Sequence, residues 1–154
     1  MTSATLSMAA GKQNLMRPIL VGGAIAGTLD LIAAFITYGM ISPRFIAAGL
    51  IGRQAIGGGA PAWLLGVLLH FLIAFSAAAI YCVSSRRLEF LKEHFLVCGM
   101  FYGIAIFLVM NLVVLPLCAL HATGPYQLRG LVQGLLVHML LIGLPISYSL
   151  RKLS

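Results

Sequence analysis

The apolar stretch from Ala62 to Ser84 constrains the fold more than any other part of the chain. It exceeds the roughly 20 residues that a helix needs to cross the hydrocarbon core of a bilayer. His70 lies inside this stretch, and a second apolar stretch, 130–150, contains His138. In both, a glycine precedes the histidine by one helical turn, at Gly66 and Gly134. These segments predict two membrane-spanning helices of similar design, each with an imidazole within the membrane.

The composition predicts a membrane protein, because 61% of the residues are hydrophobic and only 8% are charged. Soluble domains normally carry about 25% charged residues. A chain of 154 residues has room for four spans with short loops, and none for a separate soluble catalytic domain. The formal net charge of +7 comes from short basic runs beside apolar segments, without interleaved aromatic residues, so we expect no nucleic-acid partner.

The expected fold class is all-α: an up-down bundle of four transmembrane helices in a single domain, residues 18–154. The spans are expected near 18–41, 62–84, 95–117 and 130–150, and residues 1–17 are expected to form a cytoplasmic tail. Residues 43–56, between the first two spans, predict a short helix at the membrane interface.

The distribution of basic residues predicts the orientation of this bundle. Seven Lys and Arg fall on the side of both termini, and three fall on the other side. The seven are Lys12, Arg17, Arg86, Arg87, Lys92, Arg151 and Lys152, and the three are Arg44, Arg53 and Arg129. The positive-inside rule therefore predicts that both termini lie in the cytoplasm, in a multi-pass membrane protein that is surrounded by lipid.

Glycines at helical spacing predict close contacts between the spans, because small residues let helix backbones approach each other in lipid. These helix-packing residues are Gly23, Gly27, Gly66, Gly99, Gly103, Gly130 and Gly134. They exceed what a four-helix bundle needs, which leaves a homo-oligomer or another membrane-protein partner open.

One polar side chain in each span marks the candidate site. The four are Asp30, His70, Asn111 and His138. Counted at 1.5 Å per residue from the non-cytoplasmic boundary, they fall within a layer roughly 8 Å thick. Asp30 shares a helix face with Gly23 and Gly27, so its carboxyl is expected to point along the packed face. Ionisable groups are costly inside a membrane and are usually retained for a partner or a function.

Proton-linked or small-solute permeation is the function that this layer favours, because Asp and His inside membranes mark proton and ion paths. One alternative is a b-type haem held by His70 and His138, which lie on diagonal helices of the expected bundle. Another is a first-row metal bound by both histidines and Asp30. The last alternative is a non-catalytic scaffold or assembly partner in a membrane complex, in which the layer is inert.

No motif of an enzyme is present. The serines and histidines form no nucleophile motif, and Gly57–Gly59 lacks the Lys-Ser/Thr ending of a phosphate-binding loop. Cys82, Cys98 and Cys118 show no disulfide framework and no metal-ligand spacing. We therefore expect a protein that is not an enzyme and that has no resident cofactor in its favoured interpretation.

Three segments resemble the YagU-like group of uncharacterised bacterial inner-membrane proteins. They are HFLIAFSAAAIYCV from His70, GMFYGIAIFLVMNLVVLPLCAL from Gly99, and the histidine of the last span followed by Arg151-Lys152. The resemblance covers roughly residues 62–152. It implies a polytopic inner-membrane protein with no assigned chemistry, and it implies no role for Asp30, which it does not cover.

Overall fold

The computed structural model describes residues 14–121 and 127–154, and within these ranges it is all-helical, without a strand. Four helices are long and apolar enough to cross a membrane: Met16–Tyr38, Gly59–Ser84, Phe95–Leu117 and Leu128–Leu153. This confirms the prediction of four long apolar helices in an all-α bundle. Residues 1–13 of the predicted tail lie outside the described residues.

The long helices are joined by short elements and are themselves divided by changes in helix type. The elements are α1 (Met16–Tyr38), α2 (Ser42–Ile51), the 3₁₀ segment η1 (Arg53–Gly57), α3 (Gly59–Ser84), α4 (Phe90–Glu93), α5 (Phe95–Val109), the π-helical segment η2 (Met110–Val114), α6 (Leu115–Leu117), α7 (Leu128–Val137), the π-helical segment η3 (His138–Gly143) and α8 (Leu144–Leu153). The third long helix is thus α5, η2 and α6, and the fourth is α7, η3 and α8.

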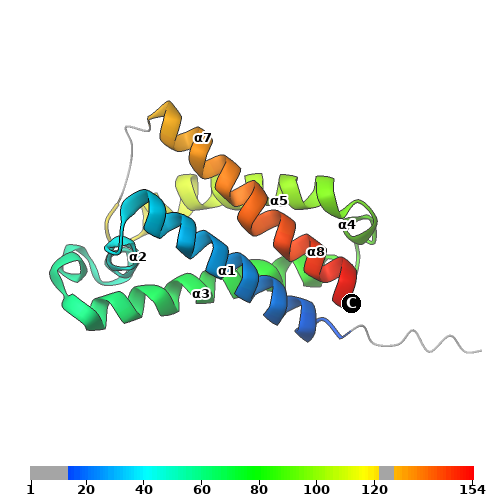
Figure 1. Cartoon of the computed structure of the whole chain (residues 1–154), viewed down its shortest axis with the longest axis horizontal. Helices are drawn as coiled ribbons and strands as arrows, with labels where there is room; N and C mark the ends of the chain where they lie inside the picture. The colour runs from blue at the N-terminus through cyan, green and yellow to red at the C-terminus, as the bar shows by residue number, and fades with distance from the viewer. Residues whose placement is uncertain (1–13, 122–126) are drawn as a thin grey trace, which may run out of the picture.

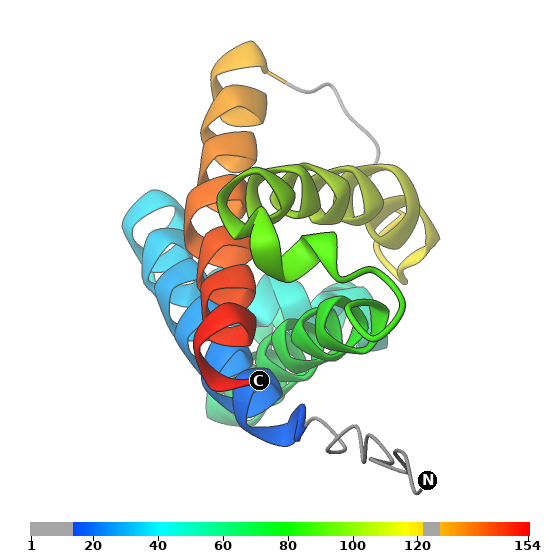
Figure 2. The same cartoon turned by 90° about the vertical axis from the view of Figure 1, so that its right-hand side faces the viewer.

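The helices form two layers that cross each other. α1 and the fourth long helix run side by side in one layer, and α3 and α5 lie in the other (Figures 1 and 2). α1 packs against α3 and α8, and α5 packs against η3 and α8. The second and fourth long helices therefore lie across the bundle from each other, and these two carry the histidines.

Basic residues gather at both ends of the bundle. The start of α1, the turn that contains α4 and the end of α8 lie at one end (Figure 1). These segments carry Arg17, Arg86, Arg87, Lys92, Arg151 and Lys152, whereas α2, η1 and the start of α7, at the opposite end, carry Arg44, Arg53 and Arg129. The described basic residues thus lie at the two ends of the bundle in the two groups that the sequence count assumes. Lys12 lies outside the described residues.

The third and fourth long helices cross at glycines. A Cβ added at Gly103 would lie 2.5 Å from the Cα of Met139, and one at Gly99 would lie 3.0 Å from the carbonyl oxygen of Gly143. On the other side of the bundle, Gly27 and Gly23 of α1 face the rings of Phe71 and Phe75 of α3. Close backbone approach of this kind is the usual basis of helix packing in lipid.

The three remaining predicted packing glycines have different surroundings. Gly66 lies against the backbone of Pro43 at the start of α2, and Gly134 faces the ring of Phe107, 2.9 Å from the position of a Cβ. A Cβ at Gly130 would meet nothing within 4 Å among the described residues, so no helix packs there. The reason is that α7 begins only two residues earlier and its first turn extends beyond its neighbours (Figure 1).

The π-helical segments are a feature that the sequence analysis does not predict. The backbone N–H of Leu115 donates to Met110, and that of Leu144 donates to Met139, five residues back in each case. Pro116 and Pro145 follow directly. Because proline has no N–H and its ring clashes with the carbonyl four residues back, a wider turn before it keeps the helix continuous.

We expect Gly103→Ala to destabilise the bundle by about 1–3 kcal/mol, because the added methyl group overpacks the crossing with Met139. Gly130→Ala is the matched control, and it should be neutral or stabilise by up to about 1 kcal/mol, because the site is open and alanine favours helix. Thermal unfolding of the purified variants in detergent measures both effects. Equal stability of the two variants would contradict the glycine crossing.

Candidate functional site

The four polar side chains of the predicted layer line one cavity of about 720 Å³. Asp30 comes from α1, His70 from α3, Asn111 from η2 and His138 from η3. The structure therefore brings together one polar residue from each long helix. The remaining wall is mainly apolar, with side chains that include Ile73, Ile106, Phe107, Val137 and Ile142.

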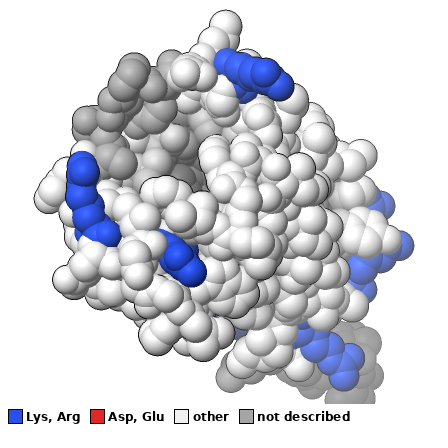
Figure 3. Space-filling model, turned by 60° about the vertical axis from the view of Figure 1, so that its left-hand side comes forward, with Lys and Arg blue, Asp and Glu red and all other residues white. Residues whose placement is uncertain are grey.

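The cavity extends from this layer towards the end of the bundle where α1 stops and α7 starts. Its lining there includes Thr37 and Tyr38 of α1, Ser42 of α2, and Gln127 and Gln133 beside and within α7. Figure 3 shows the molecular surface hollowed on this side, with no acidic side chain in view.

The opposite half of the bundle is filled by a tightly packed core. This core contains Ala26, Ala77, Ala78, Tyr81, Cys82, Ile142, Ile146 and Leu150. The hydroxyl of Tyr102 donates to the carbonyl of Ala77 at 2.7 Å, which joins α5 to α3 across the same region. The cavity is therefore closed towards the end of the bundle where α1 begins and α8 ends.

His70 connects α3 to α1. Its Nε2 donates a hydrogen bond to the carbonyl oxygen of Gly27 at 2.7 Å, and the residue is only 8% exposed. Ring and carbonyl approach this closely because Gly27 has no side chain, and the neighbouring Phe71 and Ala74 already fill the space beside it. The bond fixes the Nε2–H form of the neutral ring and leaves Nδ1 as the second nitrogen.

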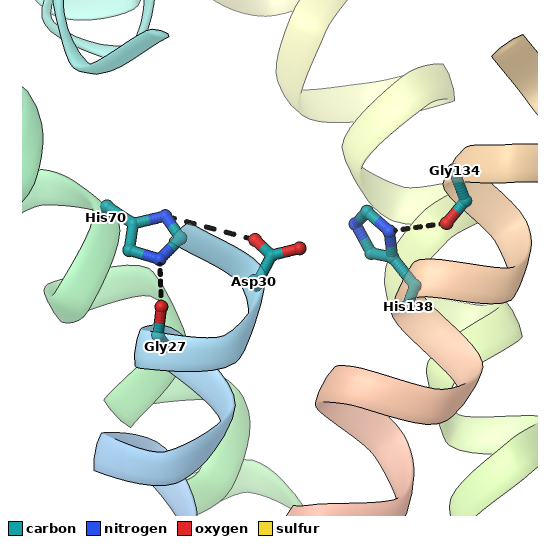
Figure 4. A network of polar contacts seen from close by, with 5 residues as sticks. All are labelled: Gly27, Asp30, His70, Gly134 and His138. Atoms are coloured by element: carbon teal, nitrogen blue, oxygen red, sulfur yellow. Dashed lines mark hydrogen bonds and ion pairs between the residues drawn. The ribbon is translucent and has the colours of Figure 1, made fainter. Parts of the chain in front are cut away.

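Asp30 faces that second nitrogen. Its Oδ2 lies 4.0 Å from Nδ1 of His70 (Figure 4), and its side chain is 22% exposed. No hydrogen bond to the carboxyl from any described residue is found, and among these residues His70 is the titratable side chain that approaches it. The pair is neutral overall with one added proton, whether that proton lies on the ring as an imidazolium or on the carboxyl. At this distance the charge of either group affects the other electrostatically.

His138 approaches Asp30 from the opposite side of the cavity (Figure 4). Its Nδ1 donates to the carbonyl oxygen of Gly134 at 2.8 Å, and its ring meets Phe107 edge-on at 5.5 Å between ring centres. In the neutral ring this bond leaves Nε2 as an acceptor that faces the cavity. The two histidines thus present different nitrogens to the space around Asp30.

Asn111 and His138 share a local arrangement. Asn111 Nδ2 donates to the carbonyl of Phe107 at 2.8 Å, so each side chain bonds a carbonyl four residues back in its own helix. Each residue also lies at the start of a π-helical segment. Both side chains therefore lie where the hydrogen-bond register of the helix changes, and π turns of this kind are frequent at functional sites.

Three further cavity residues escape the sequence analysis. Gln133 Nε2 donates to Thr37 Oγ1 at 2.8 Å, which joins α7 to α1 in the outer part of the cavity. The buried hydroxyl of Ser42 has no hydrogen-bond partner among the described residues. Thr37 lies two turns after Asp30 on the same helix face, and Gln133 lies just over one turn before His138. Polar residues at those spacings are the signal that could have identified the pair.

The geometry gives little support to a metal or a haem. Among the described residues no three His, Cys, Asp or Glu side chains are placed to hold a metal ion. The Nε2 atom of His70 is already bonded to Gly27. Gly66 and Gly134, which the haem interpretation needs as open space, are covered by Pro43 and Phe107. The residues present therefore do not fit a macrocycle between the two imidazoles.

Comparison with known proteins finds no match among family models, curated proteins or solved structures. The resemblance to the YagU-like group stays a prediction. Any function assigned to the chain therefore has to be argued from the geometry of the cavity.

The hydrogen bonds predict opposite tautomers for the two neutral histidines: Nε2–H in His70 and Nδ1–H in His138. The physical reason is that a carbonyl accepts only from a protonated nitrogen. Nitrogen-15 NMR of imidazole-labelled protein above the histidine titration range measures this directly, with His70→Gln and His138→Gln to assign the signals. The same tautomer in both rings would contradict the site geometry.

Proposed function

We propose that this chain is a multi-pass inner-membrane protein that passes protons, or a small solute together with protons, through the cavity between its four long helices. In this proposal both termini face the cytoplasm, and the cavity opens on the other side. The observation that carries it is the convergence of Asp30, His70, Asn111 and His138 on one cavity. The proposal includes no enzymatic reaction and no resident cofactor, and lipid is the expected surrounding partner.

Asp30 is the residue that a purely structural role explains least. An aspartate at the centre of a membrane costs about 3 kcal/mol on insertion scales. A hydrogen bond between helices in lipid stabilises by only about 0.6 kcal/mol on average. Asp30 accepts no such bond from a described residue. An inert scaffold would be expected to satisfy this carboxyl, so its position supports proton exchange with His70.

The packed core at the cytoplasmic end of the proposed orientation makes a continuous pore a poor description. Passage requires the closed half of the bundle to open, as in a carrier. The π-helical segments η2 and η3 are the places where the helix hydrogen bonds already change register. They lie at the level of the cavity, so we propose that the third and fourth long helices bend there.

The proposed orientation predicts that green fluorescent protein fused to either terminus is fluorescent, because this protein folds in the cytoplasm. Alkaline phosphatase inserted after Gln54, in η1, should be active, because this enzyme needs the oxidising exterior. The controls are the exchanged fusions, with alkaline phosphatase at either terminus and green fluorescent protein after Gln54. An active phosphatase at either terminus would overturn the orientation.

Proteoliposomes containing the purified chain should dissipate an imposed pH gradient, or take up small solutes, faster than protein-free liposomes. The rate should change with pH, because histidine is the side chain whose charge changes near neutral pH. We expect Asp30→Asn and His138→Ala each to lower the rate by about tenfold or more, which corresponds to about 1.4 kcal/mol. A pH-sensitive dye inside the vesicles and light scattering measure the two fluxes.

The matched control for these variants is Glu93→Gln, because Glu93 lies in the short helix α4, far along the chain from the cavity lining. It should leave the flux unchanged, and all variants should keep the unfolding temperature of the original within a few degrees. If the variants conduct like the original, or if no flux is found with a folded protein, permeation fails and a scaffold takes its place.

A further inference from the structure

The charge of the cavity lining determines which solutes it can accept. Among the described lining residues, the titratable groups are Asp30 and Tyr38 from α1, His70 from α3 and His138 from η3, and α2, η2 and α7 contribute none. Arg44 and Arg129 belong to α2 and α7 but do not line the cavity. With both histidines neutral, the carboxylate of Asp30 is the single formal charge, and the cavity is negative.

The side chains of the cavity wall determine the size and polarity of the solute that it can accept. A cavity of about 720 Å³ is of the size that holds small organic ligands. Its surface is mainly apolar, and the rings of Phe45, Phe107 and Tyr38 contribute to it. Aromatic faces attract cations, and quaternary ammonium groups are commonly bound in this way. The buried hydroxyl of Ser42, which has no hydrogen-bond partner in the described part of the chain, adds one polar group to the lining.

We propose that the cavity binds a small organic cation with an apolar body, such as a substituted amine, whose positive charge lies at Asp30. This inference rests on the proposed function, since it names the substrate class of the same cavity. It also accounts for the carboxylate that receives no hydrogen bond: a bound cation supplies the missing counter-charge.

Binding of the cation competes with the proton on His70. When His70 is an imidazolium, its Nδ1–H faces Asp30 at 4.0 Å and neutralises it. A cation at Asp30 then lies beside a second positive charge, and the imidazolium releases its Nδ1 proton to water while the Nε2 bond to Gly27 is kept. One cation enters and one proton leaves, so the charge of the site is conserved. His138 adds to the same repulsion when it is protonated.

Isothermal titration calorimetry of the full chain with benzyltrimethylammonium tests the proposal, because this probe keeps its charge at every pH. We expect saturable binding that weakens about tenfold for each pH unit below the protonation of His70, since one proton is linked to binding. Titrations in two buffers of different ionisation enthalpy should count about one released proton per cation in that pH range. Benzenesulfonate, an anion of similar size, should not bind.

Variants test the residues. Asp30→Asn should weaken the binding of benzyltrimethylammonium by about 100-fold, because the counter-charge is removed. Glu93→Gln, a matched loss of a carboxylate outside the cavity, should bind like the original. His70→Gln can still donate to Gly27 but takes up no proton, so it should bind the cation and release markedly fewer protons. If Asp30→Asn fails to fold, the measurements on the original chain decide alone.

Each outcome has one meaning. No binding of benzyltrimethylammonium, binding that is independent of pH, or equal binding of benzenesulfonate overturns the cation site. Unchanged proton release in His70→Gln overturns the exchange with that residue. Cation binding with proton release but no flux in vesicles supports this site and defeats permeation, whereas proton flux without cation binding does the reverse.

Discussion

The contact between Asp30 and His70 is the interaction on which the interpretation of this molecule depends. It joins the only aspartate of the chain to an imidazole that is itself bonded to a helix carbonyl, inside a bundle with an apolar exterior. At a separation of 4.0 Å the two groups interact electrostatically, so a proton on one changes the electric field at the other. A carboxyl without hydrogen bonds in such surroundings is either protonated or paired with a cation.

The rest of the bundle keeps this pair accessible from one end and sealed from the other. The crossing of Gly99 and Gly103 with Gly143 brings the third and fourth long helices together between the polar side chains and the end of the bundle where α8 ends. Beyond the layer, α7 diverges from its neighbours, and a Cβ at Gly130 would meet no described atom within 4 Å. The cavity lies in the space between the tight crossing and the diverging end. The same fold thus supplies a tightly packed half, where α8 ends, and a half that contains the cavity, where α7 begins.

The sequence predicts the long helices well because this prediction depends on local information. A long apolar run identifies a span, and the third span, 95–117, coincides with the observed helix Phe95–Leu117. Asp30, His70, Asn111 and His138, which the sequence analysis expects at one depth, all line the cavity. Their function in permeation stays a prediction, since shared position does not test it.

What the sequence could not supply depends on contacts between distant residues. That Pro43 covers Gly66 and Phe107 covers Gly134 is visible only in three dimensions. The π turns depend on how the helix accommodates Pro116 and Pro145, which a periodicity of 3.6 residues does not reveal. Asn111 and His138, which bond carbonyls of their own helices, lie within those turns.

Because Asp30 is the only aspartate, carbon-13 in the aspartate carboxyl gives a single NMR signal that reports this residue alone. The most direct measurement follows that signal and the Nδ1 signal of His70 together as the pH is varied. The account predicts that the carboxyl signal moves over the pH interval in which His70 gains its proton, and that this movement is lost in His70→Gln. A carboxyl signal that stays constant while His70 titrates would contradict the shared proton on which the account depends.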